Sequence, residues 1–142
     1  EKEVKREKGG EAKVEEEKVK EKAAAAAPSP PPMFNGYLTS KGIHSALQYL
    51  ANSYPSIVQL ITLPEKTYEG YTSKAIKLGV NNAAPKNGIL LLGGVHAREI
   101  LNPDMLVKLA LNLCQAYTSN TGLTFGGKSF SAQDIKQIVE NL

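Results

Sequence analysis

Two side chains three positions apart, His96 and Glu99, could together bind a metal ion. Imidazole nitrogen and carboxylate oxygen are both ligands that zinc takes in proteins, and a turn after a strand can aim both at one point. Arg98 lies between them, and its guanidinium could neutralise an anionic group of a substrate through a two-pronged contact. The spacing alone has low specificity. It also fits a surface ion pair between Arg98 and Glu99 beside a His96 with a structural role.

The segment before these residues is the most apolar stretch of the chain. Residues 89–92 have the sequence Ile-Leu-Leu-Leu, which predicts a central strand buried on both faces. Gly93 and Gly94 follow, and they allow the backbone to come close to another group of atoms. Open α/β sheets place their ligands at the carboxyl ends of such strands. The sequence therefore predicts that His96 and Glu99 lie at the edge of a sheet.

Capping residues and apolar residues at helical spacing indicate three helices. The first spans residues 40–54, with Pro55 after its end. Asparagine and serine side chains can accept the free N–H groups of a first turn, and proline fits the first helical position. The residues predicted to begin the helices are, in chain order, Thr39 or Ser40, Asn102 followed by Pro103 and Asp104, and Ser131 paired with Asp134 in a capping box.

Two further strands are predicted over residues 57–63 and 72–80, where β-branched and alternating apolar residues occur. Glu69 and Gly70 mark a turn between them. The expected fold class is α/β, with a mixed β-sheet flanked by helices. Because three strands make a thin sheet, we expect the domain to be incomplete and a further strand to follow Leu142.

The composition separates a tail from a core within the 142 residues. Residues 1–32 hold eight Glu, eight Lys or Arg, a run of five Ala and four Pro. They have too few large apolar side chains to form a core, so we predict a disordered charged tail and a stiff proline-rich linker. Residues 33–142 carry the whole net charge of +3, which is too small and scattered for a nucleic-acid-binding face. The longest apolar run of the core is too short to span a membrane.

Residues 122–129 match the pattern G-x-x-x-x-G-K-[ST] of phosphate-binding loops. That mechanism requires a strand before the loop and a helix directly after it, so that backbone N–H groups converge on phosphate. Here a predicted helix ends near Tyr117, and the next begins only at about Ser131. We therefore expect a flexible glycine-rich connection. Two other side chains could bind a metal but have simpler interpretations. His44 lies off the apolar face of its helix, which predicts a surface residue. Cys114 lies on the apolar face of its helix, which predicts a packed small hydrophobic residue.

The sequence around His96 resembles the first zinc motif of the zinc metallocarboxypeptidases related to carboxypeptidases A, B and T. The specific part is residues 94–99, Gly-Val-His-Ala-Arg-Glu, after an apolar strand. The resemblance covers residues 37–142, which correspond to about the first third of a family catalytic domain. Its other segments are residues 37–39, 50–55, 68–71, 75–78, 112–117 and 134–142.

The resemblance implies that His96 and Glu99 are two of the three ligands of one Zn²⁺ ion and that Arg98 contacts bound peptide. It also implies a later His as third ligand and a later Glu as general base, both beyond Leu142, so no catalytic base is identified here. The expected function is a zinc-dependent metallocarboxypeptidase that hydrolyses the C-terminal peptide bond of peptides or proteins. The 142 residues alone are expected to be inactive. Secretion is common in the family.

A second hypothesis remains at this point. The chain would then be a non-catalytic α/β interaction module in which His96 is structural. The expected partner under the first hypothesis is a peptide or protein C-terminus, with no nucleic acid and no membrane span.

Overall fold

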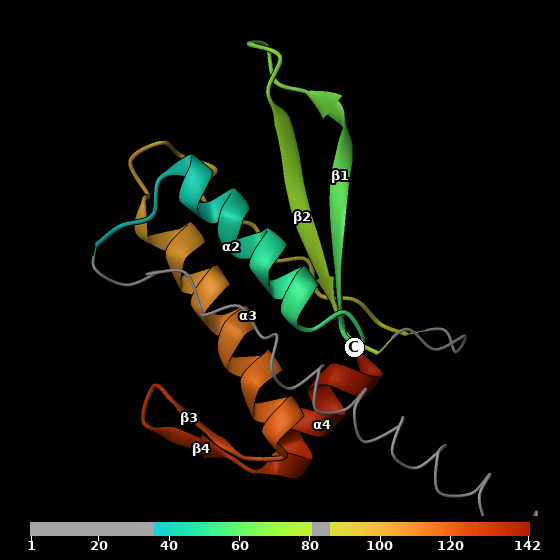
Figure 1. Ribbon diagram of the computed structural model, residues 1–142. Coiled ribbons are helices and arrows are strands. Elements are labelled where there is room, and N and C mark those ends of the chain that lie inside the picture. The colour runs from blue at the N-terminus through green and yellow to red at the C-terminus, as the bar shows by residue number, and fades with distance from the viewer. Residues whose placement is uncertain (1–35, 81–85) are drawn as a thin grey trace, which may run out of the picture.

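The computed structural model describes residues 36–80 and 86–142 (Figure 1). The predicted tail and linker over residues 1–32 lie outside the described residues. The described part combines helices with two small sheets and confirms the α/β class. Each sheet has two antiparallel strands, so the described residues form no mixed sheet.

Helix α2 (Ser40–Ser53) forms where the apolar periodicity predicted it. Thr39 is its N-cap, and its hydroxyl oxygen accepts a hydrogen bond from the Gly42 N–H at 3.1 Å. Such a bond satisfies one of the free donors of the first turn. Ala46 and Leu50 are fully buried and define the face that packs on the core. The predicted cap and apolar face are confirmed.

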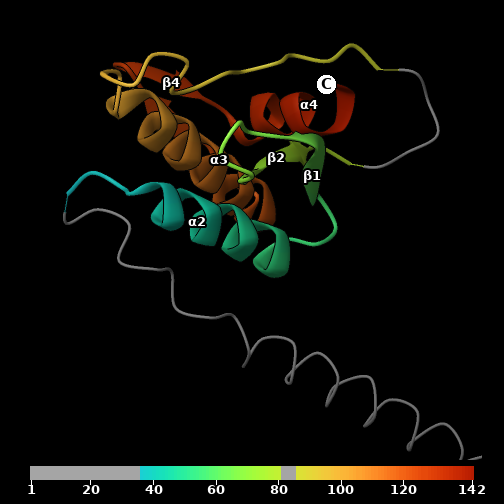
Figure 2. The same cartoon turned by 90° about the horizontal axis from the view of Figure 1, so that it is seen from above.

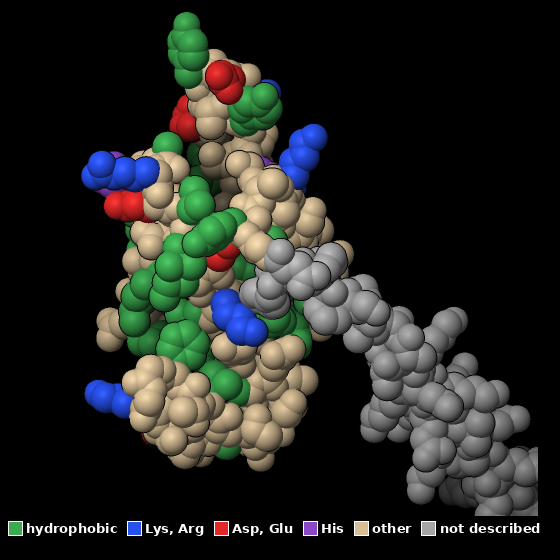
Figure 3. Space-filling view, turned by 90° about the vertical axis from the view of Figure 1, so that its left-hand side faces the viewer, with side chains coloured by type: hydrophobic (Ala, Val, Ile, Leu, Met, Phe, Trp, Pro, Cys, Tyr) green, Lys and Arg blue, Asp and Glu red, His purple; other side chains and the backbone are tan. Residues whose placement is uncertain are grey.

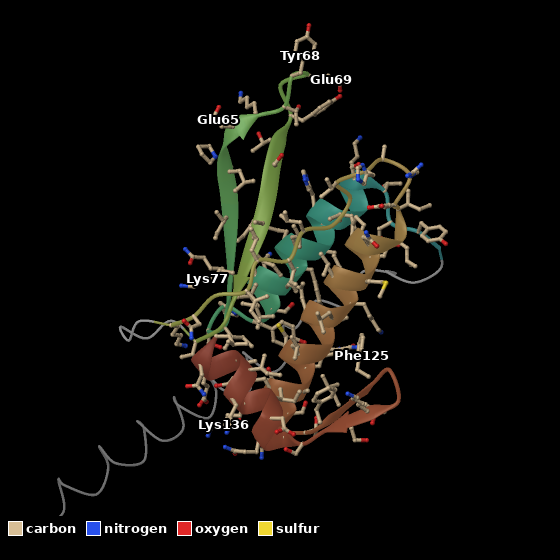
Figure 4. All side chains as sticks on the ribbon, turned by 180° about the vertical axis from the view of Figure 1, so that it is seen from behind. Glu65, Tyr68, Glu69, Lys77, Phe125 and Lys136 are labelled. Carbon is tan, nitrogen blue, oxygen red and sulfur yellow. The ribbon has the colours of Figure 1, made fainter. Side chains whose placement is uncertain are left out.

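Strands β1 (Val58–Lys66) and β2 (Thr72–Leu78) form a long antiparallel hairpin. Its turn is closed by Thr67, whose carbonyl oxygen accepts the Gly70 N–H at 2.9 Å. Gly70 has a φ of +83°, a conformation that favours glycine. The base of the hairpin is buried in the core, whereas its tip projects beyond the helices and presents Tyr68 to solvent (Figures 1 and 4).

Helix α3 (Leu101–Ser119) forms the centre of the core. It contacts α2, which lies beside it in Figures 1 and 2, and it contacts the last helix near its own C-terminal end. Its buried residues are Val107, Ala110, Leu111, Cys114 and Ala116. Together with residues of α2, β1 and the last helix they make one hydrophobic cluster, and the described residues bury no charged or polar residue.

The predicted start of α3 was wrong in its details. The N-cap is Ile100, in a helical conformation with φ −65° and ψ −21°, and no side chain caps the helix. A preceding turn runs directly into the helix, so no extended residue offers its side chain to the first N–H groups. Asp104 lies in the first turn of the helix as predicted, and its carboxylate also accepts the Leu38 N–H at 3.2 and 3.3 Å. This contact ties the entry of α2 to the first turn of α3.

Strands β3 (Leu123–Phe125) and β4 (Lys128–Phe130) form a short hairpin, and helix α4 (Ala132–Asn141) follows. The predicted capping box is confirmed: the Asp134 N–H donates to the Ser131 hydroxyl at 3.2 Å, and the Ser131 N–H donates to the Asp134 carboxylate at 2.7 Å. These hydrogen bonds hold the pKa of Asp134 below its ordinary value.

The end of β2 docks on α4, which joins the first hairpin to the C-terminal helix. The Val80 N–H donates to the Val139 carbonyl at 2.9 Å. Gly79 has a φ of +147°, and a Cβ there would lie 3.1 Å from the Leu142 carbonyl oxygen. Glycine is therefore needed on both conformational and steric grounds.

Residues 89–92 do not form the predicted central strand. They pair with no strand in the described part of the chain, and their side chains are 67%, 82%, 55% and 70% exposed. Apolar composition indicates a tendency to be buried, but a strand also needs a neighbour with free backbone groups, and here each hairpin pairs with itself. Further exposed hydrophobic side chains accompany this segment, and Figure 3 shows a band of them on one face of the molecule.

Candidate metal centre

His96 and Glu99 lie at the two ends of one backbone turn. The Glu99 N–H donates to the His96 carbonyl oxygen at 2.9 Å. A bond of this i to i+3 type brings the Cα atoms of its end residues within about 7 Å of each other. The Asn102 N–H donates in turn to the Glu99 carbonyl oxygen at 3.3 Å, and α3 begins at Leu101. The backbone thus holds the two potential ligands near each other at the start of a helix.

Two glycines fix this turn against the first turns of α3. A Cβ at Gly93 would lie 3.0 Å from a methyl carbon of Leu106 and 3.1 Å from the Pro103 nitrogen. Gly94 has a φ of +74°, and a Cβ there would lie 3.1 Å from the Pro103 ring. The close backbone approach predicted for these glycines is therefore present, and the element they approach is the start of α3.

The two potential ligands differ in their surroundings. His96 is exposed, and within the described ranges its imidazole has no hydrogen-bond partner. Glu99 is half-buried, and its Oε2 accepts a hydrogen bond from the Asn102 amide at 3.3 Å. His96 is therefore accessible to an ion from solvent.

Arg98 is exposed, and no carboxylate within the described ranges pairs with it. The alternative of an Arg98–Glu99 ion pair is therefore not realised among the described residues, and Glu99 accepts a hydrogen bond from Asn102. The guanidinium remains available for an anionic group of a bound molecule.

His96 and Glu99 could supply two of the ligands of a zinc site. A catalytic zinc ion takes three protein ligands and an open position. Among residues 36–80 and 86–142 no three His, Cys, Asp or Glu side chains lie together in a way that could hold a metal ion. Cys114 is fully buried as predicted, and burial raises the pKa of its thiol to about 12, which disfavours the thiolate that binds metal. His44 is half-buried on α2.

The glycine-rich pattern at residues 122–129 forms a β-hairpin. Gly126 and Gly127, with φ of +59° and +79°, make the two-residue turn, and Lys128 and Ser129 belong to β4. The Ser129 hydroxyl lies 3.3 Å from the Thr124 hydroxyl across the hairpin. The predicted flexible connection was therefore wrong, and the strand–loop–helix geometry of a phosphate loop does not occur here.

Comparison with protein families gives the decisive observation. The family model described as zinc carboxypeptidase matches residues 43–142. The chain belongs to the zinc carboxypeptidase family. The match includes the His96–Glu99 turn and every helix and strand described above except the first residues of α2.

Family relatives include proteins named as enzymes and proteins named as inactive. Zinc carboxypeptidase A 1 of Anopheles gambiae is 36% identical over 70 residues, which are 49% of this chain and 16% of that protein. Inactive metallocarboxypeptidase ECM14 of Ajellomyces dermatitidis is 30% identical over 94 residues, 64% of this chain and 16% of that protein. Carboxypeptidase B of Helicoverpa zea is 28% identical over 89 residues, 61% of this chain and 20% of that protein. The chain thus spans at most a fifth of these relatives. No solved structure matches it.

One residue beside the candidate site in this chain was not predicted from the sequence. Asn102 was interpreted as a helix cap, yet its amide contacts Glu99. The spacing of three residues between them was a usable signal, because side chains three apart on a helical turn are neighbours.

Proposed function

We propose that the chain forms the N-terminal part, residues 33–142, of the catalytic domain of a zinc-dependent metallocarboxypeptidase that hydrolyses the C-terminal peptide bond of peptides or proteins. Family membership supports the reaction class. The observation that carries the proposal is the backbone turn that joins His96, whose side chain is exposed, to Glu99.

In this proposal His96 and Glu99 hold one Zn²⁺ ion, and Arg98 binds the peptide substrate near it. A bound zinc ion would polarise the scissile carbonyl and lower the pKa of a water molecule. The third ligand and the general base come from further sequence of the protein, since the relatives are several times longer than the segment they share with this chain.

No helix in the described ranges is long and apolar enough to cross a lipid bilayer.

A non-catalytic role is the second candidate, because several relatives are named inactive metallocarboxypeptidases. Those proteins are about as similar to this chain as the named enzymes are. The two candidates differ in whether His96 binds metal.

Calorimetric titration of the 142-residue chain, without an affinity tag, with zinc tests the proposal. Two ligands leave the ion largely hydrated, so we expect one weak site, micromolar or weaker, that is lost in His96→Ala and in Glu99→Gln. His44→Ala is the matched control and should bind as the unaltered chain does. Zinc binding that both ligand variants retain in full would contradict the proposal. A nanomolar affinity would contradict the assignment of only two ligands.

A further inference from the structure

Asn102 contacts Glu99 through both its backbone and its side chain. Its N–H donates to the Glu99 carbonyl oxygen at 3.3 Å, and its Nδ2 donates to the Glu99 Oε2 at 3.3 Å. An ionised carboxylate only accepts hydrogen bonds, so the amide nitrogen and not the amide oxygen must face it. One residue therefore restrains the position of Glu99 and the orientation of its carboxylate.

The ordinary reasons for an asparagine at this position do not apply. Asn102 is the second residue of α3 and not its N-cap, and no side chain caps this helix. The residue is exposed, so it fills no space in the core. Asparagine also favours helix less than alanine or glutamate does. Its side chain has no structural partner other than Glu99 in the described part of the chain.

The first turn of α3, which carries Asn102, is anchored by two contacts. Pro103 lies against the backbone of Gly93 and Gly94, and Asp104 accepts the Leu38 N–H. An amide on such an anchored turn can hold a neighbouring side chain in place, whereas a half-buried glutamate without a partner can still change rotamer. Because Oε2 is engaged by the amide, Oε1 is left for another partner.

We infer that Asn102 is a positioning residue for metal binding: it orients the Glu99 carboxylate so that Oε1 faces an ion held by His96. This inference rests on the proposed function. Hydrogen bonds to a metal-binding carboxylate fix its geometry, and losing such a partner typically weakens metal binding 10- to 100-fold.

Zinc titration of three variants of the chain tests the inference. Asn102→Ala removes the donor, Asn102→Gln keeps an amide donor, and Gln115→Ala removes an exposed amide elsewhere on α3 as a control. We expect about tenfold weaker zinc binding for Asn102→Ala, an affinity for Asn102→Gln between those of Asn102→Ala and the unaltered chain, and no change for Gln115→Ala. The thermal midpoint of Asn102→Ala should not fall below that of the unaltered chain, since alanine favours helix more than asparagine and a merely structural role would lower the midpoint.

The outcomes separate this inference from the proposed function. If His96-dependent zinc binding is present and Asn102→Ala retains it unweakened, the positioning role is wrong and the proposed function stands. If Asn102→Ala weakens binding only in proportion to a loss of folded protein, the residue is structural and the inference is overturned. If the unaltered chain shows no His96-dependent binding, the inference and the proposed function both fail.

Discussion

Replacing His96 with Ala in a full-length protein that contains this chain should abolish release of C-terminal residues from peptides. Under the proposed function this change removes one of three zinc ligands and leaves an incomplete site. Charge stabilisation by a catalytic metal contributes several kcal/mol to the rate. We therefore expect a loss of about a thousandfold or more in activity, together with loss of bound zinc, since each ~1.4 kcal/mol changes a rate tenfold.

The measurement is release of the last amino acid from a peptide, with the same peptide amidated at its C-terminus as substrate control. His44→Ala provides the protein control, because it removes the other histidine of this chain. Activity that survives His96→Ala but requires a free peptide C-terminus would show that the metal is held elsewhere. An inactive unaltered protein that still binds zinc through His96 would favour the non-catalytic candidate.

Residues 89–92 should make the isolated chain associate with copies of itself. These residues are extended, unpaired and more than half exposed, and no charged residue lies between Lys86 and Arg98. Short apolar segments without charge or proline template pairing with another strand. Sedimentation velocity should show a mean mass that rises with concentration, and hydrophobic dye should bind.

A double substitution, Leu90→Lys with Leu92→Lys, should shift the chain to monomer. The two side chains are 82% and 70% exposed, so their replacement removes little packing, while like charges on one strand face oppose pairing. Ser45→Lys, on the exposed face of α2, adds charge away from the segment and should leave association unchanged. A chain that is monomeric at every concentration without any substitution would contradict this prediction.

Elements with local signals were predictable from the sequence. The cap at Thr39, the turn at Gly70 and the Ser131 capping box each depend on residues within a few positions, and each forms as expected. The strand at residues 89–92 depended on a partner strand, which local sequence does not specify. The β3–β4 hairpin was missed because strands of three residues are too short to show alternation.

In the candidate site, too, local features were predictable and features that depend on distant contacts were not. The spacing of His96 and Glu99 predicted two neighbouring donors, and the structure places them on one turn. The start of α3 was harder to predict, because Asn102 and Asp104 can each cap a helix or bond elsewhere. The choice depends on the chain path before the helix, where the 96–99 turn and Leu38 supply the partners. The hydrogen-bond partners of Asn102 and Asp104 were therefore decided by tertiary contacts, which residue type alone does not predict.

Under the proposed function His96 and Glu99 bind zinc, and the two histidines of the chain allow a direct test. Zinc is titrated into the ¹⁵N-labelled chain, and the imidazole nitrogen resonances of His96 and His44 are followed by NMR. We predict that the His96 resonances shift with zinc concentration, that those of His44 do not, and that Glu99→Gln reduces the shift. Shifts confined to His44, or equal shifts at both histidines, would contradict the account.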